Sequence, residues 1–396
     1  MNFISGTKSW LLPILAAISF TACQKDLKEN KDPQSQTETE AAKKKPSFNN
    51  WTISTFAGSD TRGYAGDGGP VSSALLNDVE NVYVDKKGNV YISQVADQVI
   101  RKVDARSGII TTIAGNGQNG FSGDDGPATQ ASLSNAFHIV ADDEGNLYIS
   151  DLSNNRIRRI DHRTGIINTI AGTGVQGFNG DGPALTRDLT GPFGLQLDQK
   201  GNLIFSDQFG LCLRKMNLRT GMITTIAGNN LNRGYGGDGG PATQASFDFI
   251  WHVALDNGCG DIYVGDVSNH RVRKIDGRSG IITTVAGNGI QGNSGMGGPA
   301  TQASFTEPVG VALDKEGNLF VCDQVLMQIY RIDRKTGLIN LIAGNGTYGF
   351  SGDGGPSVLS VLNHPNSLSF DPIGNLFFSD TYNNRVRKIT TNHQMN

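Results

Sequence analysis

Charge and cysteine are both scarce in this sequence. Charged residues make up 18% of the 396 residues, below the usual share of about 25%, and the net charge is only −3. These values argue against a strongly basic nucleic-acid-binding protein and against an acidic disordered chain. The body of the chain holds Cys212, Cys259 and Cys322 without CxxC spacing, so at most one internal disulfide can form and isolated thiols are expected.

The chain also lacks a hydrophobic run long enough to span a membrane after its N-terminal region. The run from Trp10 to Phe20 is too short for a spanning helix and fits the core of a signal peptide over residues 1–22. It ends at Phe20-Thr21-Ala22-Cys23, which resembles the cleavage box of bacterial lipoproteins, although Phe20 replaces the usual Leu. We expect Cys23 to be lipidated; ordinary cleavage beside an incidental cysteine is the alternative.

The segment that follows Cys23 is polar. Its first residues, Gln24 to Glu29, resemble the charged export signal of surface lipoproteins in the Bacteroidetes. Residues 24–50 cannot bury a core, so we expect residues 23–50 to form a flexible tether. The resemblance implies an outer-membrane lipoprotein at the cell surface, which meets the membrane only through its lipid anchor.

Glycine, by contrast, is abundant and recurs with a fixed period. It makes up 52 of the 396 residues, about 13% against an average of about 7%. An Ala-Gly pair ends a Thr- and Ile-rich segment six times, at intervals of 56 to 59 residues. The pairs are 57–58, 114–115, 171–172, 227–228, 286–287 and 343–344. A period of this size indicates a repeat architecture.

Each repeat predicts four strands. In the second repeat, segments near 137–142, 147–151, 156–161 and 166–171 are separated by turns rich in Asp, Asn and Gly. Four antiparallel strands in a radially repeated unit form a propeller blade. The sixth repeat stops after its third strand at Ile389, and residues 52–58 align with the missing strand. We therefore predict an all-β, six-bladed β-propeller over residues 51–390, closed by its N-terminal strand, with a tail at 391–396.

The blade pattern resembles the NHL-repeat family. The residues that carry the resemblance are Gly145-Asn146-Leu147-Tyr148, Asp151, Asn154-Asn155-Arg156, Asp266 and Asn269-His270-Arg271. It extends over all six repeats and is specific for the fold. It is weak for function, because related six-bladed propellers include binding modules, sensor domains, lactonases and an amidating lyase.

Residues that recur in nearly every repeat are expected to hold the blades together. The Asp of each Gly-Asp-Gly insert is interpreted as a turn or cap residue, because one carboxylate per insert is too few for calcium, which takes about six to eight oxygens. The Asp that ends the second strand and the Arg of the third strand are assigned to pairing within or between blades. An RNA-binding basic face, the alternative, is disfavoured by the net charge and by export. The recurring residues are Asp67, Asp124, Asp181, Asp238 and Asp353; Asp151, Asp207, Asp266, Asp323 and Asp380; Arg101, Arg158, Arg214, Arg273 and Arg387.

A binding site in a repeat protein is expected where blades depart from their consensus. The innermost strand normally begins Pro-x-Gly, and four repeats differ there. The residues at these positions are predicted to ring one mouth of the central channel: Glu80, Asn81, Phe137, His138, Phe193, Trp251, His252, Asn366 and Ser367. Aromatic faces beside hydrogen-bonding groups suit a sugar or another flat polar ligand, and channel packing with satisfied histidines is the alternative. The turns at 209–212 and 326–328 are apolar and are expected on the same face. They either line one side of a groove or reflect random sequence drift.

Two classes of function follow. The first is a non-catalytic surface module that binds a glycan, a peptide or a protein partner at the channel mouth. The second is an enzyme of the lactonase or lyase type, with His138 and His252 as catalytic candidates. The binding module is favoured, because the sequence shows no Ser-His-Asp spacing, P-loop or paired-cysteine motif. No nucleic-acid partner is expected.

The enzyme hypothesis includes a metal site, but the sequence does not decide between two metals and two sets of ligands. The family resemblance implies zinc held by histidines, for which His138, His252 and His364 are candidates, or calcium held by Glu80, Asn81 and Asn366. His364 is offset by three residues from the register of the other histidines, which is hard to reconcile with zinc–nitrogen bonds of about 2.0–2.1 Å. A metal-free lyase using His138 or His252 as the base is a further alternative. No cofactor is assigned.

Overall fold

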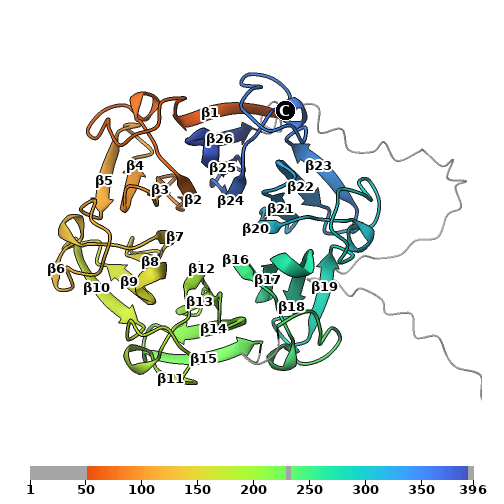
Figure 1. The fold of residues 1–396 in the computed structure, drawn as a ribbon, viewed down its shortest axis with the longest axis horizontal. Helices are drawn as coiled ribbons and strands as arrows, with labels where there is room; N and C mark the ends of the chain where they lie inside the picture. Colours follow the sequence, from red (N-terminus) through yellow and green to blue (C-terminus); the bar gives the residue numbers. More distant parts are fainter. Residues whose placement is uncertain (1–50, 229–232, 391–396) are drawn as a thin grey trace, which may run out of the picture. The chain divides into compact units, whose positions relative to one another are not determined.

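The computed structural model describes residues 51–228 and 233–390, which belong to one compact unit. The predicted signal peptide, Cys23, the tether and the tail at 391–396 lie outside the described residues. Six antiparallel blades surround a central channel, which confirms the predicted six-bladed, all-β fold (Figure 1). Within the described ranges, no helix is long and apolar enough to cross a membrane.

The four long strands of each blade follow one another outward from the channel. Blade 1 contains β2 (Val79–Val84), β3 (Val90–Gln94), β4 (Val99–Val103) and β5 (Ile110–Ala114). Blade 2 contains β7 (Ala136–Ala141), β8 (Leu147–Asp151), β9 (Arg156–Ile160) and β10 (Ile166–Ala171), with the short β6 (Gly126–Pro127) outside them. Blade 3 contains β12 (Pro192–Leu197), β13 (Asn202–Asp207), β14 (Cys212–Asn217) and β15 (Met222–Ala227), with β11 (Gly182–Pro183) outside them.

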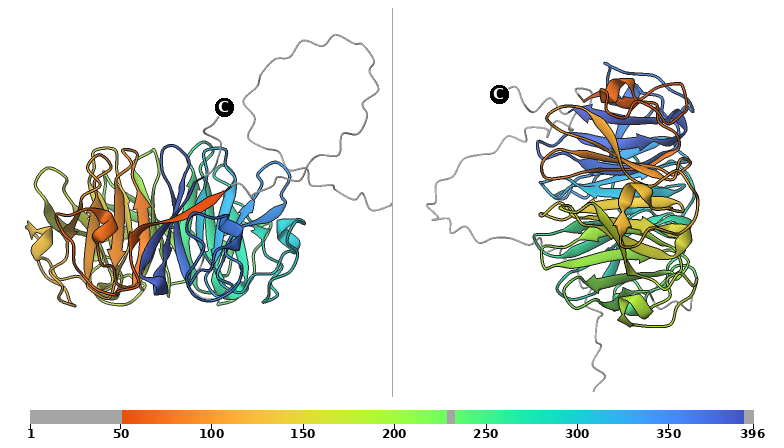
Figure 2. Two further views of the ribbon diagram at one scale, coloured as in Figure 1. Left: turned by 90° about the horizontal axis from the view of Figure 1, so that it is seen from above. Right: turned by 90° about the vertical axis from the view of Figure 1, so that its left-hand side faces the viewer.

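The other three blades complete the ring. Blade 4 contains β16 (Ile250–Asp256), β17 (Asp261–Asp266), β18 (Arg271–Ile275) and β19 (Ile282–Ala286). Blade 5 contains β20 (Pro308–Leu313), β21 (Leu319–Asp323), β22 (Gln328–Ile332) and β23 (Ile339–Ala343). Blade 6 contains β24 (Pro365–Phe370), β25 (Leu376–Asp380), β26 (Arg385–Thr390) and β1 (Thr52–Gly58). In side view, the strands run between the two faces of the propeller (Figure 2).

Short 3-10 turns are the helical elements of the described residues. Six lie in the inserts between blades, each directly after a proline: η2 (Val71–Ser73), η3 (Ala128–Gln130), η5 (Ala184–Thr186), η6 (Ala242–Gln244), η8 (Ala300–Gln302) and η9 (Ser357–Leu359). Three follow a second strand: η4 (Leu152–Asn154), η7 (Val267–Asn269) and η10 (Thr381–Asn383).

The ring closes through β1, the N-terminal strand of the described part. It pairs antiparallel with β26, with Ile53 opposite Ile389. Ile53 is buried in a cluster that includes Phe378 of blade 6 and Phe320 of blade 5. The strand therefore fills the outer position of blade 6 and covers an edge that would otherwise be open to other chains.

The hydrophobic core lies between neighbouring blades. The second strands β3, β8, β21 and β25 are buried at every residue, because a blade packs against each of their faces. Apolar residues of successive blades therefore share clusters; Tyr91 of blade 1, for example, packs with Ile139 and Ile149 of blade 2.

The predicted pairing of the second-strand Asp with the Arg of the third strand is confirmed in blades 2, 3, 4 and 6. In five blades the buried Arg also pairs with the insert Asp, which the sequence had indicated to be a turn or cap residue. In blade 2, Arg158 is fully buried and contacts Asp151 at 3.3 Å and Asp124 at 2.7 Å. Asp124 also accepts the backbone N–H of Thr169 at 2.9 Å, so the insert carboxylate is occupied by an arginine and by a strand. Blades 1, 3, 4 and 6 repeat the pairing of Arg with the insert Asp.

Blade 5 replaces this ionic set as a unit. Tyr330 stands in the position of the buried Arg, Met296 in that of the insert Asp, and Asn293 in that of the insert aromatic residue. The Tyr330 hydroxyl donates to Gln328 Oε1 at 2.6 Å, and Asn293 Nδ2 donates to the same oxygen at 3.0 Å. A neutral hydrogen-bonded network therefore takes the place of the buried Arg and the insert Asp, whereas Asp323, the Asp of the second strand, remains buried.

Candidate functional site

The innermost strands begin with an irregularity that sets the directions of the mouth residues. In β7, β12 and β16, the pairing register shifts across 136–139, 192–195 and 250–253. The backbone N–H freed in blade 2, at His138, donates to Ser150 Oγ at 2.7 Å, and the N–H of Gly194 in blade 3 donates to Ser206 Oγ at 2.9 Å. A bulge of this kind re-aims side chains relative to a regular strand.

Five aromatic rings follow one another along the mouth of the channel, and we call them the aromatic arc: Phe137, Phe193, Trp251, Phe249 and Phe209. Successive ring centroids are 4.7, 4.9, 5.9 and 6.0 Å apart. Phe193 is only 1% exposed and lies between Phe137 and Trp251, whereas Phe209 is 52% exposed. The predicted placement of the Phe209 turn on the face of the mouth is confirmed by its contact with Phe249.

Phe249 adopts a backbone conformation that a bulky residue rarely occupies. Its φ is +62°, and the residues at the same position in the other blades include Asp78, Asn135 and Gly191, which also have positive φ. Asn, Asp and Gly tolerate this region, but a phenylalanine there is strained by about 1–3 kcal/mol. The chain therefore holds an aromatic ring at the mouth against a local energetic penalty.

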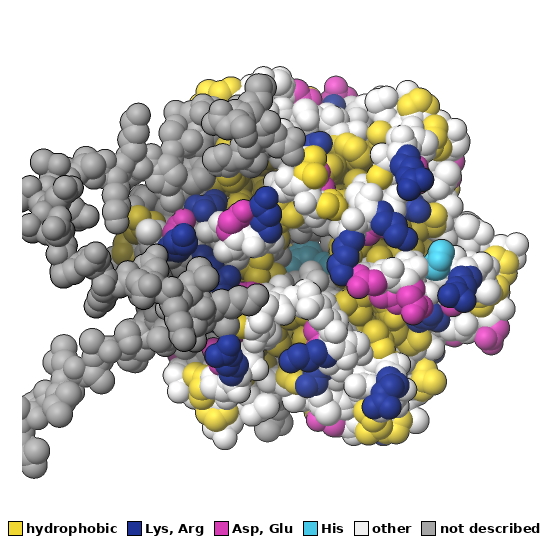
Figure 3. Space-filling view, turned by 180° about the vertical axis from the view of Figure 1, so that it is seen from behind, with side chains coloured by type: hydrophobic (Ala, Val, Ile, Leu, Met, Phe, Trp, Pro, Cys, Tyr) yellow, Lys and Arg dark blue, Asp and Glu magenta, His cyan; other side chains and the backbone are white. Residues whose placement is uncertain are grey.

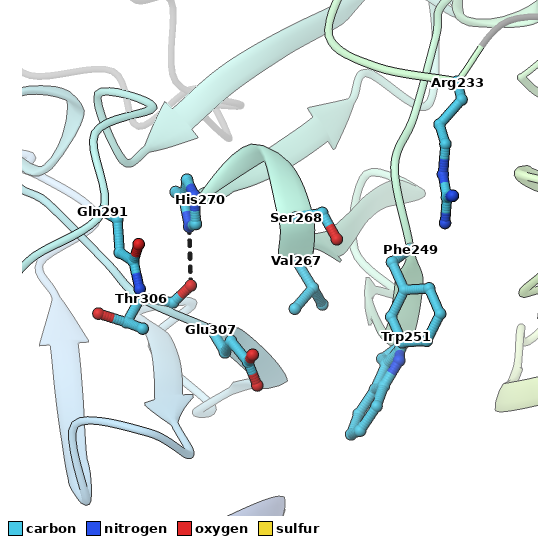
Figure 4. Close-up of a pocket in the computed structure, with 9 residues that line it drawn as sticks. All are labelled: Arg233, Phe249, Trp251, Val267, Ser268, His270, Gln291, Thr306 and Glu307. Atoms are coloured by element: carbon cyan, nitrogen blue, oxygen red, sulfur yellow. Dashed lines mark hydrogen bonds between the residues drawn. The ribbon is translucent and has the colours of Figure 1, made fainter.

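A pocket of about 480 Å³ adjoins the aromatic arc between blades 4 and 5 (Figure 4). Phe249 and Trp251 form one wall, and His270, Gln291 and Glu307 lie across from them. Ser268 and Val267, in the short turn η7, lie between the two walls. The volume falls within the range of about 300–1,000 Å³ that is usual for small-molecule sites.

His138 and His252 line a different hollow. Their rings lie 5.2 Å apart and are 6% and 4% exposed. They border a space of about 200 Å³ whose other walls include Tyr83, Leu255 and Leu313, from the opposite ends of the innermost strands. One face of the propeller shows histidine (cyan) at the bottom of its central hollow (Figure 3). Of the residues predicted to ring one mouth, Trp251 therefore lines the pocket between blades 4 and 5, whereas His138 and His252 line this second hollow.

Both histidines are neutral at pH 7. Burial lowers the pKa of His138 well below its ordinary value, and the neighbouring His252 lowers it further. Burial also lowers the pKa of His252 to about 4, against a smaller opposing effect of its bond to Val309. His252 Nδ1 donates to the Val309 carbonyl at 3.2 Å, so its Nε2 is an acceptor. His138 Nδ1 has no hydrogen-bond partner in the described part of the chain.

Glu80 and Asn366 meet where blade 1 joins blade 6. Asn366 Nδ2 donates to Glu80 Oε2. The pKa of Glu80 is raised to about 8, mainly by burial and also by the charge of Asp78, against the opposing effect of the hydrogen bond from Asn366. Asn366 Oδ1 finds no partner among the described residues, so a protonated Glu80 can donate to it and complete a paired acid–amide contact.

Asn81 and Ser367 are buried and take part in contacts between blades. Asn81 Oδ1 accepts the N–H of Ile139 at 3.3 Å, and Ser367 Oγ accepts the N–H of Val82 at 2.8 Å. Both side chains therefore have structural partners. Their proposed contact with a ligand stays a prediction, as do those of Glu80, Phe137, Phe193 and Asn366.

Comparison with known proteins agrees with this architecture. No family model matches the chain. "NHL repeat-containing protein 2" of Gallus gallus is 24% identical over 301 residues, which are 69% of this chain and 41% of that protein. This chain is a six-bladed β-propeller with NHL-repeat homologues. It spans less than half the length of the curated relatives that it matches first.

Solved structures share the propeller fold. A protein of unknown function from Bacteroides thetaiotaomicron aligns with a TM-score of 0.64 and 17% identity, covering 86% of this chain and 76% of that one. An auxiliary nutrient binding protein from Bacteroides ovatus aligns with a TM-score of 0.63 and 15% identity, with the same coverage. At these identities the likeness shows the fold of the propeller.

The three histidines considered as zinc ligands are not brought together as one group. The ring of His364 stacks on Tyr382 at 4.4 Å, away from the pair formed by His138 and His252. Across residues 51–228 and 233–390, the set whose three ligand atoms lie within 4.8 Å of one another is Asp256, Cys259 and Asp261. Its carboxylates already pair with cations, Asp256 with Arg334 at 3.3 Å and Asp261 with Lys274 at 2.5 Å.

Several residues of the propeller mouth were not among the sequence-based candidates: Phe249, His270, Gln291 and Glu307. Phe249 and Glu307 both stand one residue before an innermost strand, directly beside the positions that were considered. The same position holds Asp78, Asn135, Gly191 and His364 in the other blades. The replacement of small or turn-forming residues by Phe249 was therefore a signal present in the sequence.

Proposed function

We propose that this chain is a non-catalytic binding module that holds its ligand at the mouth of the channel, beside the aromatic arc. The aromatic arc is the observation that carries the proposal. It draws rings from blades 2, 3 and 4. The blade repeat does not require them, since the positions of Phe137, Phe193 and Trp251 hold Glu80, Val309 and Asn366 in blades 1, 5 and 6. Partly exposed aromatic rings beside a few polar groups are typical of ligand sites.

The proposal includes the location of the module. Lipidation of Cys23 would anchor the chain in the outer membrane, and residues 24–50 would connect the anchor to the propeller at the cell surface. The solved neighbours from Bacteroides support a role in binding, because two of them are described as auxiliary nutrient binding proteins. For this chain, a glycan, a peptide or a protein partner are the classes considered.

The size of the site favours a small ligand or one end of a polymer. A stable protein partner usually covers about 800 Å² on each side, whereas the concave feature at this mouth is a pocket of about 480 Å³. We therefore expect the ligand to enter the mouth rather than to cover the face.

Substitution of the exposed part of the aromatic arc tests the proposal. The chain after the predicted signal peptide is screened on a glycan array and against a random peptide library. Trp251→Ala should abolish binding while the thermal unfolding temperature shows that the ring stays folded. Tyr348→Ala is the control, because Tyr348 is an exposed aromatic residue outside the aromatic arc. Binding that survives Trp251→Ala combined with His138→Ala would place the site elsewhere.

An enzyme using His138 and His252 is the second candidate function. The observation that favours it is a pair of neutral imidazoles at one hollow, with His138 Nδ1 free of a protein partner among the described residues. A neutral imidazole can act as a general base. Turnover of a lactone, an ester or a polysaccharide-lyase substrate that His138→Ala and His252→Ala both remove would support this candidate over the binding module.

A further inference from the structure

The pocket between blades 4 and 5 combines an apolar wall with a polar wall, and its chemistry narrows the class of ligand. We propose that this pocket binds an uncharged saccharide unit, stacked on Trp251 and Phe249 and hydrogen-bonded from the side of blade 5. The inference rests on the proposed function, because it names the ligand class and the position within the same mouth.

The apolar wall fits the flat C–H face of a sugar ring. Trp251 and Phe249 stand side by side in this wall, with ring centroids 5.9 Å apart (Figure 4). Trp251 Nε1 is buried and has no hydrogen-bond partner among the described residues. An indole N–H normally finds a partner when buried, and an unmade bond costs about 1–3 kcal/mol. Nε1 is almost inaccessible in this structure, so a ligand hydroxyl would supply the missing acceptor after a small rotation of the Trp251 ring toward the pocket.

The polar wall offers both donors and acceptors. His270 Nδ1 lies 2.7 Å from the Thr306 carbonyl and must donate to it, so Nε2 is an acceptor when the ring is neutral. Glu307 adds a carboxylate, which accepts from Gln324 Nε2 and is thereby oriented. Gln291 adds an amide, and Ser268, which lies between the two walls, adds a hydroxyl. Sugar hydroxyls donate and accept at once, so a mixed wall of this kind can satisfy several of them.

The charges at the pocket favour an uncharged sugar over an acidic one. Arg233 is the cation among the lining residues, and its Nε lies 2.8 Å from Asp248 Oδ1, so its charge is already compensated. The carboxylate of Glu307 then leaves the pocket with an excess of negative charge, which would repel a uronic or sialic acid. A neutral hexose or an N-acetylhexosamine carries no such penalty.

Tryptophan fluorescence gives a direct readout of this pocket. The chain has three tryptophans, Trp10, Trp51 and Trp251, and the first lies in the predicted signal peptide. With Trp51→Phe, Trp251 becomes the sole tryptophan of the chain after residue 22, and a phenylalanine can keep the stacking of residue 51 on Phe320. The probes are arrayed oligosaccharides with neutral, N-acetylated or uronic-acid termini; the best-bound one is then titrated while Trp251 emission is followed.

Two substitutions in the polar wall and a matched control test whether the ligand binds in this pocket. Glu307→Gln and Gln291→Ala should each weaken binding of the neutral oligosaccharide about tenfold, the effect of losing one polar contact. Gln176→Ala is the control, because Gln176 occupies the same insert position in blade 3, bridged to Leu189 as Gln291 is bridged to Phe305. The control should bind within about twofold of the parent chain.

The outcomes separate this inference from the proposed function. Binding that Glu307→Gln and Gln291→Ala both leave intact, or that does not change Trp251 emission, would overturn the assignment to this pocket. Another outcome is that the array shows no binding, or binding of acidic sugars only, while a peptide from the library binds in a Trp251-dependent manner. In that case the assignment of an uncharged saccharide is wrong and the proposal of a binding module is supported. If neither library binds, the proposed function fails together with the inference.

Discussion

Replacement of Glu80 by glutamine is expected to make the propeller more stable above pH 5. The folded chain holds this carboxyl at a pKa of about 8, whereas its ordinary value is 4.5. Between these values the folded state binds more protons than the unfolded state, so the free energy of unfolding must fall as pH rises. The loss begins near pH 4.5 and is complete above about pH 8.

The magnitude follows from the size of the shift. A difference of about 3.5 pKa units corresponds to a loss on the order of 5 kcal/mol across the whole window, at about 1.36 kcal/mol per unit. About half of this loss, roughly 2.5 kcal/mol, falls between pH 5 and pH 7. Glu80→Gln keeps a paired amide contact to Asn366 and does not titrate, so its stability should lack this component of the pH dependence.

Urea unfolding at pH 5, 6, 7 and 8 provides the assay, with the difference between wild type and variant as the measured quantity. The difference cancels other titrating groups and should grow in favour of Glu80→Gln as pH rises. Asp78→Asn should reduce the pH dependence of the wild type, because the Asp78 charge contributes to the raised pKa of Glu80. Glu316→Gln, at an exposed carboxyl in another blade, is the control. A difference that stays constant from pH 5 to pH 8 would refute the reasoning.

Four further outcomes are expected. Arg158→Met should lower the free energy of unfolding by about 3–5 kcal/mol in chemical denaturation, because it leaves Asp151 buried without its cation. Deletion of residues 52–58 should expose the edge of β26 and cause aggregation measurable by light scattering. Cys23→Ser should move the chain from the membrane fraction to the soluble fraction of cells. Elemental analysis should find no stoichiometric zinc or calcium; a metal that His138→Ala and His252→Ala both remove would favour the enzyme.

The fold could be predicted because its determinants are local and repeated six times. Turn residues, alternating strands and the Ala-Gly pairs recur with one period, and residues 52–58 match the strand that the last repeat lacks. The pairing of the second-strand Asp with the Arg was also predictable, whereas the pairing of the insert Asp with the same Arg was missed. Blade 5 supports it from within the chain, since Met296 and Tyr330 replace both partners together.

The division of the candidate site between two hollows could not be predicted. Phe137 and His138 are neighbours in sequence, yet the irregular start of β7 directs Phe137 to the aromatic arc and His138 to the opposite hollow. That irregularity depends on a hydrogen bond from the His138 N–H to Ser150, on the next strand. The repeat pattern shows a serine there but not the bond it makes.

The pairing of residues in the walls of the pocket could not be predicted for a different reason. Phe249 and Glu307 occupy the same position in successive blades, and they face one pocket only because blade 4 packs against blade 5. Nothing in either repeat alone relates the two side chains. Both residues depart from the repeat at the position directly before the innermost strand, but their common pocket depends on the geometry of the ring.

In this propeller, residues that depart from the repeat together have a different explanation from residues that depart from it singly. In blade 5 the changes to Asn293, Gln328 and Tyr330 occur together and form one hydrogen-bonded network, as expected when partners must fit one another inside a blade. Before the innermost strands, each blade carries its own residue, and the other five blades hold no phenylalanine where the strained Phe249 stands. A strained residue that the blade does not require is more readily explained by a ligand, which is why the mouth beside Phe249 is the part of the ring to test first.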